Sequence, residues 1–97
     1  MPDPKMLSDF RSKFLVDAIL IEKTDSWSWS VRPNQPTLGA GILSLNRHAL
    51  HFSDVTPQEM AELAELIKTL ENAVKSAFNH NIMNYLMLMM VDHHVHF

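Results

Sequence analysis

The sequence predicts a single α+β domain, in which an antiparallel sheet of about five strands carries one short and one long helix. Three observations support this prediction. A helical pattern opens the chain, short strand-like segments separated by turn residues follow it, and a long amphipathic segment stands between two groups of strands. This order is typical of α+β proteins. With 97 residues the chain can bury one modest core, so we expect one domain over residues 1–97.

Composition excludes several classes of protein. A hydrophobic content of 46% and a charged content of 20% indicate a globular protein rather than a disordered tail. The net charge of −3 offers no basic surface for nucleic acid, and the lack of cysteine excludes disulfides and thiolate metal sites. The N-terminus lacks the apolar core of a signal peptide, and the longest apolar run is far shorter than a membrane span. We therefore expect a cytoplasmic protein that binds neither nucleic acid nor a membrane.

The opening segment, DPKMLSDFRSKFL, predicts the short helix. Asp3 can act as its N-cap, and Pro4 suits the first helical position. Four apolar residues recur at helical spacing and share one face: Met6, Leu7, Phe10 and Phe14.

Three strands are expected next. Residues 18–23 form the first, and residues 26–31 (SWSWSV) alternate strictly. The second is therefore expected to be half-buried, with its tryptophans facing the core and its serines on the other face. Two prolines, an asparagine and a glycine make residues 32–39 a loop, after which AGILSLNRH begins the third strand.

The long helix carries the clearest local signal. Thr56, Pro57 and Glu59 provide an N-cap, a first helical residue and a reciprocal cap, which together form a capping box. Residues 79–81 end the helix. Its apolar stripe consists of Met60, Leu63, Ile67, Leu70, Val74, Ala77 and Phe78.

The C-terminal residues predict two more strands. Residues 82–91 are apolar on both alternating faces, as expected of a strand buried on both sides. After a turn at residues 92–93, the last strand would place His94 and His96 together on one face. Two imidazoles on one face suit metal binding, anion binding or attack on phosphorus. The alternative is a pair of exposed histidines with no role.

Several motifs, taken in order, resemble the histidine-triad (HIT) family of nucleotide-binding proteins. They are the segments LGAGILSLNRH, SDVTPQEM and HVHF, and the resemblance covers roughly residues 18–97. The family's signature is His-φ-His-φ-His-φ-φ, where φ is apolar. The resemblance implies a HIT-like domain that is C-terminally truncated within the signature strand, because a third histidine would follow Phe97.

By motif position His94 resembles the first triad histidine, and His96 resembles the second, which is the nucleophile in the family. The resemblance implies a diadenosine polyphosphate hydrolase-like enzyme. It would act as a hydrolase or nucleotidyltransferase at the α-phosphate of dinucleoside polyphosphates or nucleoside phosphoramidates, as a homodimer and without a metal ion or other cofactor. It also implies that the backbone carbonyl of His94 orients the ring of His96.

The chain departs from the family pattern at two places. Gly39-Ala40 replaces a common Gly-His, and Arg32 stands at the usual position of a ribose-binding Asp or Asn, with Asn34 nearby. We expect Arg32 and Asn34 to contact the nucleotide, although an exposed loop arginine is the simpler interpretation. Two other functions stay open: a catalytically impaired HIT-fold protein that binds nucleotides or partners, and a zinc-binding module using His93, His94 and His96.

Overall fold

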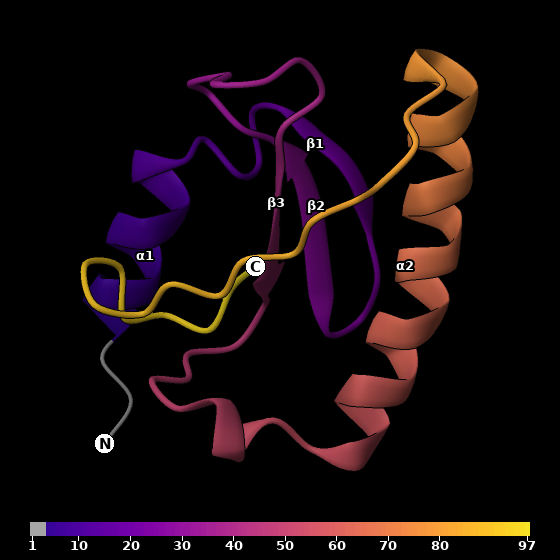
Figure 1. The fold of residues 1–97 in the computed structure, drawn as a ribbon. Helices are drawn as coiled ribbons and strands as arrows, with labels where there is room; N and C mark the ends of the chain where they lie inside the picture. Colours follow the sequence, from indigo (N-terminus) through magenta and orange to yellow (C-terminus); the bar gives the residue numbers. More distant parts are fainter. Residues whose placement is uncertain (1–3) are drawn as a thin grey trace.

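The structure, a computed structural model, describes residues 4–97. Figure 1 shows a sheet between two helices, with the C-terminal segment running from the end of α2 across to α1. The sheet is antiparallel, with strand order β1-β2-β3. The α+β class, the short helix and the long helix are confirmed. The elements are α1 (Pro4–Lys13), β1 (Leu20–Lys23), β2 (Trp27–Val31), β3 (Gly41–Leu45), a 3-10 turn (Phe52–Asp54) and α2 (Pro57–Phe78).

The two faces of the sheet differ chemically because β2 alternates tryptophan with serine, and β3 places Leu43 and Leu45 on one face and Ile42 and Ser44 on the other. The strands pair so that Trp27 lies opposite Leu45 and Ser28 lies opposite Ser44, which places like residues on the same face. We call the apolar face, which packs against α2, the α2 face. We call the opposite face, which is covered by α1, the α1 face. The core of the α2 face contains Trp27, Trp29, Leu43, Leu45, Ala49, Leu63, Leu66, Leu70 and Val95.

Helix α2 spans the predicted residues and begins with the predicted capping box. The Glu59 backbone N–H donates to the Thr56 hydroxyl at 3.2 Å, and the Thr56 N–H donates to the Glu59 carboxylate at 2.8 Å. The predicted stripe is correct at its centre, where Leu63 and Leu70 are buried, whereas Met60 and Phe78 are exposed. Neither helix in residues 4–97 is long and apolar enough to cross a membrane.

The strand of residues 26–31 is not half-buried as predicted. Ser28, Ser30 and Ser44 are all 0% exposed, because α1 covers the face on which they lie. The contact is an apolar cluster that joins Phe10 of α1, Val16 of the segment after α1 and Ile42 of β3. Its predicted N-cap, Asp3, lies outside the described residues.

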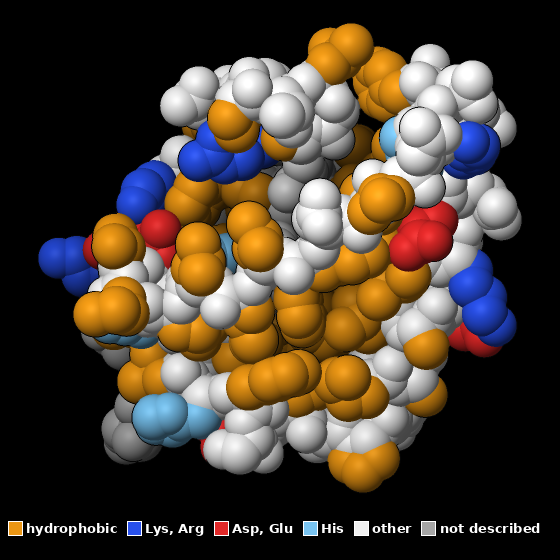
Figure 2. Space-filling view, viewed as in Figure 1, with side chains coloured by type: hydrophobic (Ala, Val, Ile, Leu, Met, Phe, Trp, Pro, Cys, Tyr) orange, Lys and Arg blue, Asp and Glu red, His pale blue; other side chains and the backbone are white. Residues whose placement is uncertain are grey.

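The predicted strand over residues 82–91 is not formed. We call these residues the crossing segment; residues 82–88 have no regular secondary structure, residues 89–91 form a turn, and none belongs to a strand of the described chain. Methionines 83, 87 and 89 pack inward onto the core of the α2 face, whereas Leu86, Leu88 and Met90 are exposed. Figure 2 shows hydrophobic side chains gathered between this segment and α2. The sheet therefore has three strands rather than five, and residues 94–97 add a single isolated bridge.

Candidate functional site

Residues 94–97 lie antiparallel beside β3 and place both histidines on the α1 face. Leu43 and Phe97 exchange backbone hydrogen bonds of 3.0 and 2.7 Å, and His96 lies opposite Ser44. Because side chains alternate, Val95 joins the core of the α2 face while His94 and His96 point the other way. Both imidazole rings contact Phe10 of α1, with ring centroids 5.0 and 5.1 Å from it. The predicted same-face arrangement of the two rings is therefore confirmed.

The ring of His94 is buried and is held in one tautomer. Its Nε2 lies 2.6 Å from the carbonyl oxygen of Leu45, so Nε2 carries the proton and donates it. Nδ1 is then an acceptor, and it is buried without a hydrogen-bond partner. The side chain is only 1% exposed, and burial lowers its pKa below the ordinary 6.5, although the hydrogen bond to Leu45 acts in the opposite direction. His94 is therefore neutral at physiological pH.

The ring of His96 is held by its neighbour. Its Nδ1 lies 2.6 Å from the carbonyl oxygen of His94, which fixes the proton on Nδ1 and leaves a lone pair on Nε2. The side chain is only partly buried. Its ring lies near two aromatic rings of the α1 region, with centroid distances of 5.1 Å to Phe10 and 6.4 Å to Phe14. In its neutral form, the ring of His96 thus has the tautomer that leaves Nε2 available as a nitrogen nucleophile.

A cleft of about 410 Å³ lies between α1 and the turn that precedes His94. Its volume is within the usual range for small-molecule sites. Lys13 of α1 bonds Asp92 across it at 2.7 Å. The cleft ends on His94, and both lysines and aspartates line it. Its lining comprises Lys5, Met6, Asp9, Phe10, Lys13, Val91, Asp92, His93 and His94.

Arg32 and Asn34 lie together in the loop between β2 and β3. The Arg32 guanidinium donates to the Asn34 carbonyl at 2.5 Å, and Gln35 braces the loop by donating to the carbonyls of Arg32 and Ala40. No hydrogen bond or ion pair of the described residues joins Arg32 or Asn34 to either histidine. The structure therefore places these two predicted nucleotide ligands in a separate loop.

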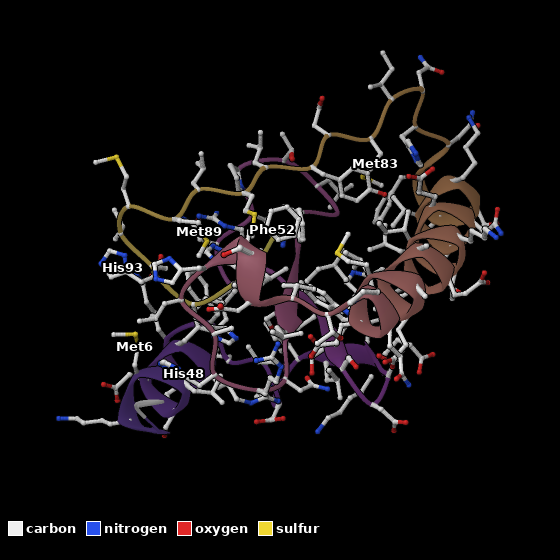
Figure 3. All side chains as sticks on the ribbon, turned by 90° about the horizontal axis from the view of Figure 1, so that it is seen from below. Met6, His48, Phe52, Met83, Met89 and His93 are labelled. Atoms are coloured by element: carbon white, nitrogen blue, oxygen red, sulfur yellow. The ribbon has the colours of Figure 1, made fainter. Side chains whose placement is uncertain are left out.

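The third histidine of the zinc hypothesis points elsewhere. Figure 3 shows His93 at the turn of the C-terminal segment, where its Nδ1 lies 2.8 Å from the carbonyl oxygen of Met89. Within residues 4–97 there is no group of three or more His, Cys, Asp or Glu side chains able to hold a metal ion. The geometry does not support the zinc-binding alternative.

Sequence reasoning missed the buried serines of the α1 face as site residues. The hydroxyls of Ser30 and Ser44 are buried without a hydrogen-bond partner, and Ser44 lies directly beside His96. The SWSWSV alternation indicates that the serines share one face of β2, but it does not indicate that this face is buried.

Comparison with known proteins assigns no family: no family model matches the chain, and no curated protein matches it. Function is therefore inferred from the geometry of the site. Two imidazoles with fixed tautomers lie on the α1 face, and the ring of His96 is the less buried of the two.

Proposed function

We propose that this protein is an enzyme that catalyses displacement at phosphorus and uses a histidine as its nucleophile. More specifically, we propose a HIT-type nucleotide hydrolase or nucleotidyltransferase, in which His96 attacks the α-phosphorus of a dinucleoside polyphosphate or nucleoside phosphoramidate. The observation that carries the proposal is the 2.6 Å contact from His96 Nδ1 to the His94 carbonyl, because it leaves the Nε2 lone pair for attack.

The chemistry follows from this tautomer. Nε2 of His96 forms a bond to phosphorus while the bond from phosphorus to the leaving oxygen or nitrogen breaks, and the leaving group takes a proton from solvent. The ring becomes cationic, and the hydrogen bond from Nδ1–H to the His94 carbonyl then becomes charge-assisted and stronger. Water attacks the same phosphorus in a second step and releases the nucleotide and the neutral ring. Dividing one displacement into two easier ones is the advantage of covalent catalysis.

The surroundings of the histidines fit a nucleotide. Phe10 and Phe14, whose rings are 4.9 Å apart, provide aromatic surface of the kind on which a base can stack. Lys13 lines the adjacent cleft in an exposed ion pair with Asp92, and exchange of this carboxylate for a phosphate would bind the entering substrate. Arg32 and Asn34 remain proposed ligands at the far end of the substrate, where the β2–β3 loop is exposed.

Mutation of the proposed nucleophile tests the function directly. We expect the wild-type chain to hydrolyse diadenosine polyphosphate or adenosine phosphoramidate and to trap a nucleotidyl adduct visible by intact mass. His96→Ala should lose both signals, with a rate at least about a hundredfold lower. His51→Ala is the matched control, because His51 is exposed and does not line the cleft. Equal rates in the wild type and His96→Ala would exclude the proposed nucleophile.

One observation favours a second candidate, a protein that binds nucleotides without turning them over. Phe10 lies against both histidine rings, so α1 covers the site in the present conformation. The same experiment separates the two candidates. AMP binding without any hydrolysis above the His96→Ala level would assign the chain to the binding class.

A further inference from the structure

We infer that Ser44 and Ser30 form a hydroxyl floor that binds the phosphoryl or ribose oxygens of the substrate held at His96. This inference deepens the proposed function and rests on it. The carrying observation is that both hydroxyls are buried without any hydrogen-bond partner, on the same face as the histidine pair. The serines would bind and orient the substrate, whereas the bond-forming atom remains Nε2 of His96.

The positions of these serines follow from the strand register. Ser28 lies opposite Ser44, and Ser44 lies opposite His96, so a row of two hydroxyls and one imidazole crosses the sheet. Directly opposite residues in such a ladder have Cβ atoms about 4.5–5.5 Å apart. Ser30 lies two residues along β2 and is therefore diagonal to Ser44. Ser44 is thus the closer of the two unpartnered hydroxyls to the proposed nucleophile.

The three serines of this face are not equivalent. Ser28 donates to the Asn46 side-chain oxygen at 2.5 Å, and Asn46 is anchored in turn on the carbonyl of Thr24. Its hydroxyl therefore serves the fold. The hydroxyls of Ser30 and Ser44 have no such role, and Nδ1 of the adjacent His94 is likewise an unpartnered acceptor. The buried Nε2 of His48, whose ring centroid lies 6.4 Å from that of His94, also has no partner.

A purely structural origin for these serines is hard to defend. Valine or isoleucine would suit a buried strand position better than serine, both in strand preference and in the cost of burial. Nearly all buried polar groups in folded proteins have a partner, so each exception requires an explanation. Positions that violate local consistency are expected at functional sites. A bound nucleotide supplies the missing acceptors as phosphoryl or hydroxyl oxygens.

The substrate reaches the hydroxyls of Ser30 and Ser44 by entering beside α1. Phe10 is the α1 side chain that contacts both histidine rings, and the cleft lined by Phe10 and His94 opens next to it. Lys13 holds the rim of this cleft through an exposed ion pair with Asp92, which is the kind of contact that breaks readily. A modest displacement of α1 would therefore expose the hydroxyls without disturbing the core of the α2 face.

The test compares stability and AMP affinity in the full chain. We expect Ser44→Ala to weaken AMP binding about tenfold or more, which is the usual effect of removing a hydrogen bond to a charged group. Ser30→Ala should show a smaller loss in the same direction. The melting temperature of both variants should stay unchanged or rise, because alanine removes an orphaned polar group. Ser44→Cys, which keeps the volume but is a weak donor, should behave as Ser44→Ala does.

Ser28→Ala is the matched control and should give the opposite pattern, with a lower melting temperature and unchanged AMP affinity. Unchanged AMP affinity in Ser44→Ala would overturn the inference and leave the His96 mechanism standing. A Ser44→Ala variant that melts earlier or fails to fold would also overturn it, because the hydroxyl would then serve the fold through buried water. Absence of AMP binding by the wild type would instead reject the proposed function itself.

Discussion

The two faces of the sheet are built from the same strands but satisfy their polar groups differently. On the α2 face the Trp27 indole donates to the Glu59 carbonyl at 2.8 Å, and the Glu59 carboxylate bonds both Arg47 and the start of α2. On the α1 face a small apolar cluster surrounds buried serines, and two hydroxyls and one imidazole nitrogen have no partner. The larger apolar core therefore lies on the α2 face, and the α1 face contains buried polar atoms without partners.

The largest expected effect is a loss in the free energy of unfolding. Its size at residues of the two faces tests whether the α2 face contributes most of the stability. Leu45 and Ile42 belong to the same strand but point to opposite faces. We expect Leu45→Ala to lower the free energy of unfolding by about 2–5 kcal/mol, because it opens a cavity in the larger core. Ile42→Ala should lie at the lower end of that range, since the small cluster under α1 can relax. Denaturant unfolding of both variants measures the difference, and equal losses would show that the two faces are equally important.

The sequence predicted the α2 side better than the α1 side, because its signals are local. The cap at Thr56, the reciprocal Glu59 and the 3.6-residue stripe define α2 without reference to any distant residue. The alternation of Trp27 and Trp29 likewise identifies a core face. Burial of the serines depends on where α1 docks, and no pattern within β2 contains that information.

The crossing segment was mispredicted for a related reason. An apolar pattern on both faces predicts a buried strand, but a strand also requires a neighbouring backbone with which to pair. In the described chain, Met83 and Met89 use their side chains to cover the core, and the Tyr85 hydroxyl bonds Glu71 of α2 at 2.5 Å. The segment is thus held by side chains. At the candidate site the parity of His94 and His96 was predictable from the two-residue period, whereas the burial of His94 under Phe10 was not.

A smaller effect on stability is expected from the Glu59 carboxylate, which has hydrogen-bond partners on the α2 side. Hydrogen bonds from Arg47 lower the pKa of Glu59 to about 2, against a partial opposing effect of burial. The free energy that this carboxylate contributes is fully present above pH 4.5 and is lost as the pH falls from 4.5 to about 2.

We expect Glu59→Gln to cost about 1–2 kcal/mol at neutral pH, a value reduced by the half-exposed Arg47 side chain. The difference in melting temperature between the wild type and the variant should disappear as the pH falls from 4.5 to about 2, and thermal melts over this range would measure it. Glu65→Gln, which breaks the exposed pair with Lys68, is the control and should change little. A difference in melting temperature that is the same at about pH 2 as at neutral pH would show that Glu59 acts through packing alone.

The smallest expected effect comes from His94, whose pKa is lowered chiefly by burial, with smaller contributions in the same direction from the charges of His48, His96 and Arg11. Below pH 6.5 His94 is protonated in the unfolded chain but not yet in the folded chain. The free energy of unfolding therefore decreases as the pH falls through 6.5. The loss cannot exceed about 1.4 kcal/mol per pH unit for one group. Melting temperatures at about pH 7.5 and pH 5.5 should therefore differ more in the wild type than in His94→Gln.

His51→Gln is the matched control, because His51 is exposed. This variant should show the same difference in melting temperature between the two pH values as the wild type. Identical slopes in the wild type and His94→Gln would mean that water reaches the His94 ring in solution. In that case α1 would not seal the face on which the histidines lie, and its polar atoms would be hydrated rather than orphaned. The pH dependence of His94 thus measures how closed the α1 face is before any ligand binds.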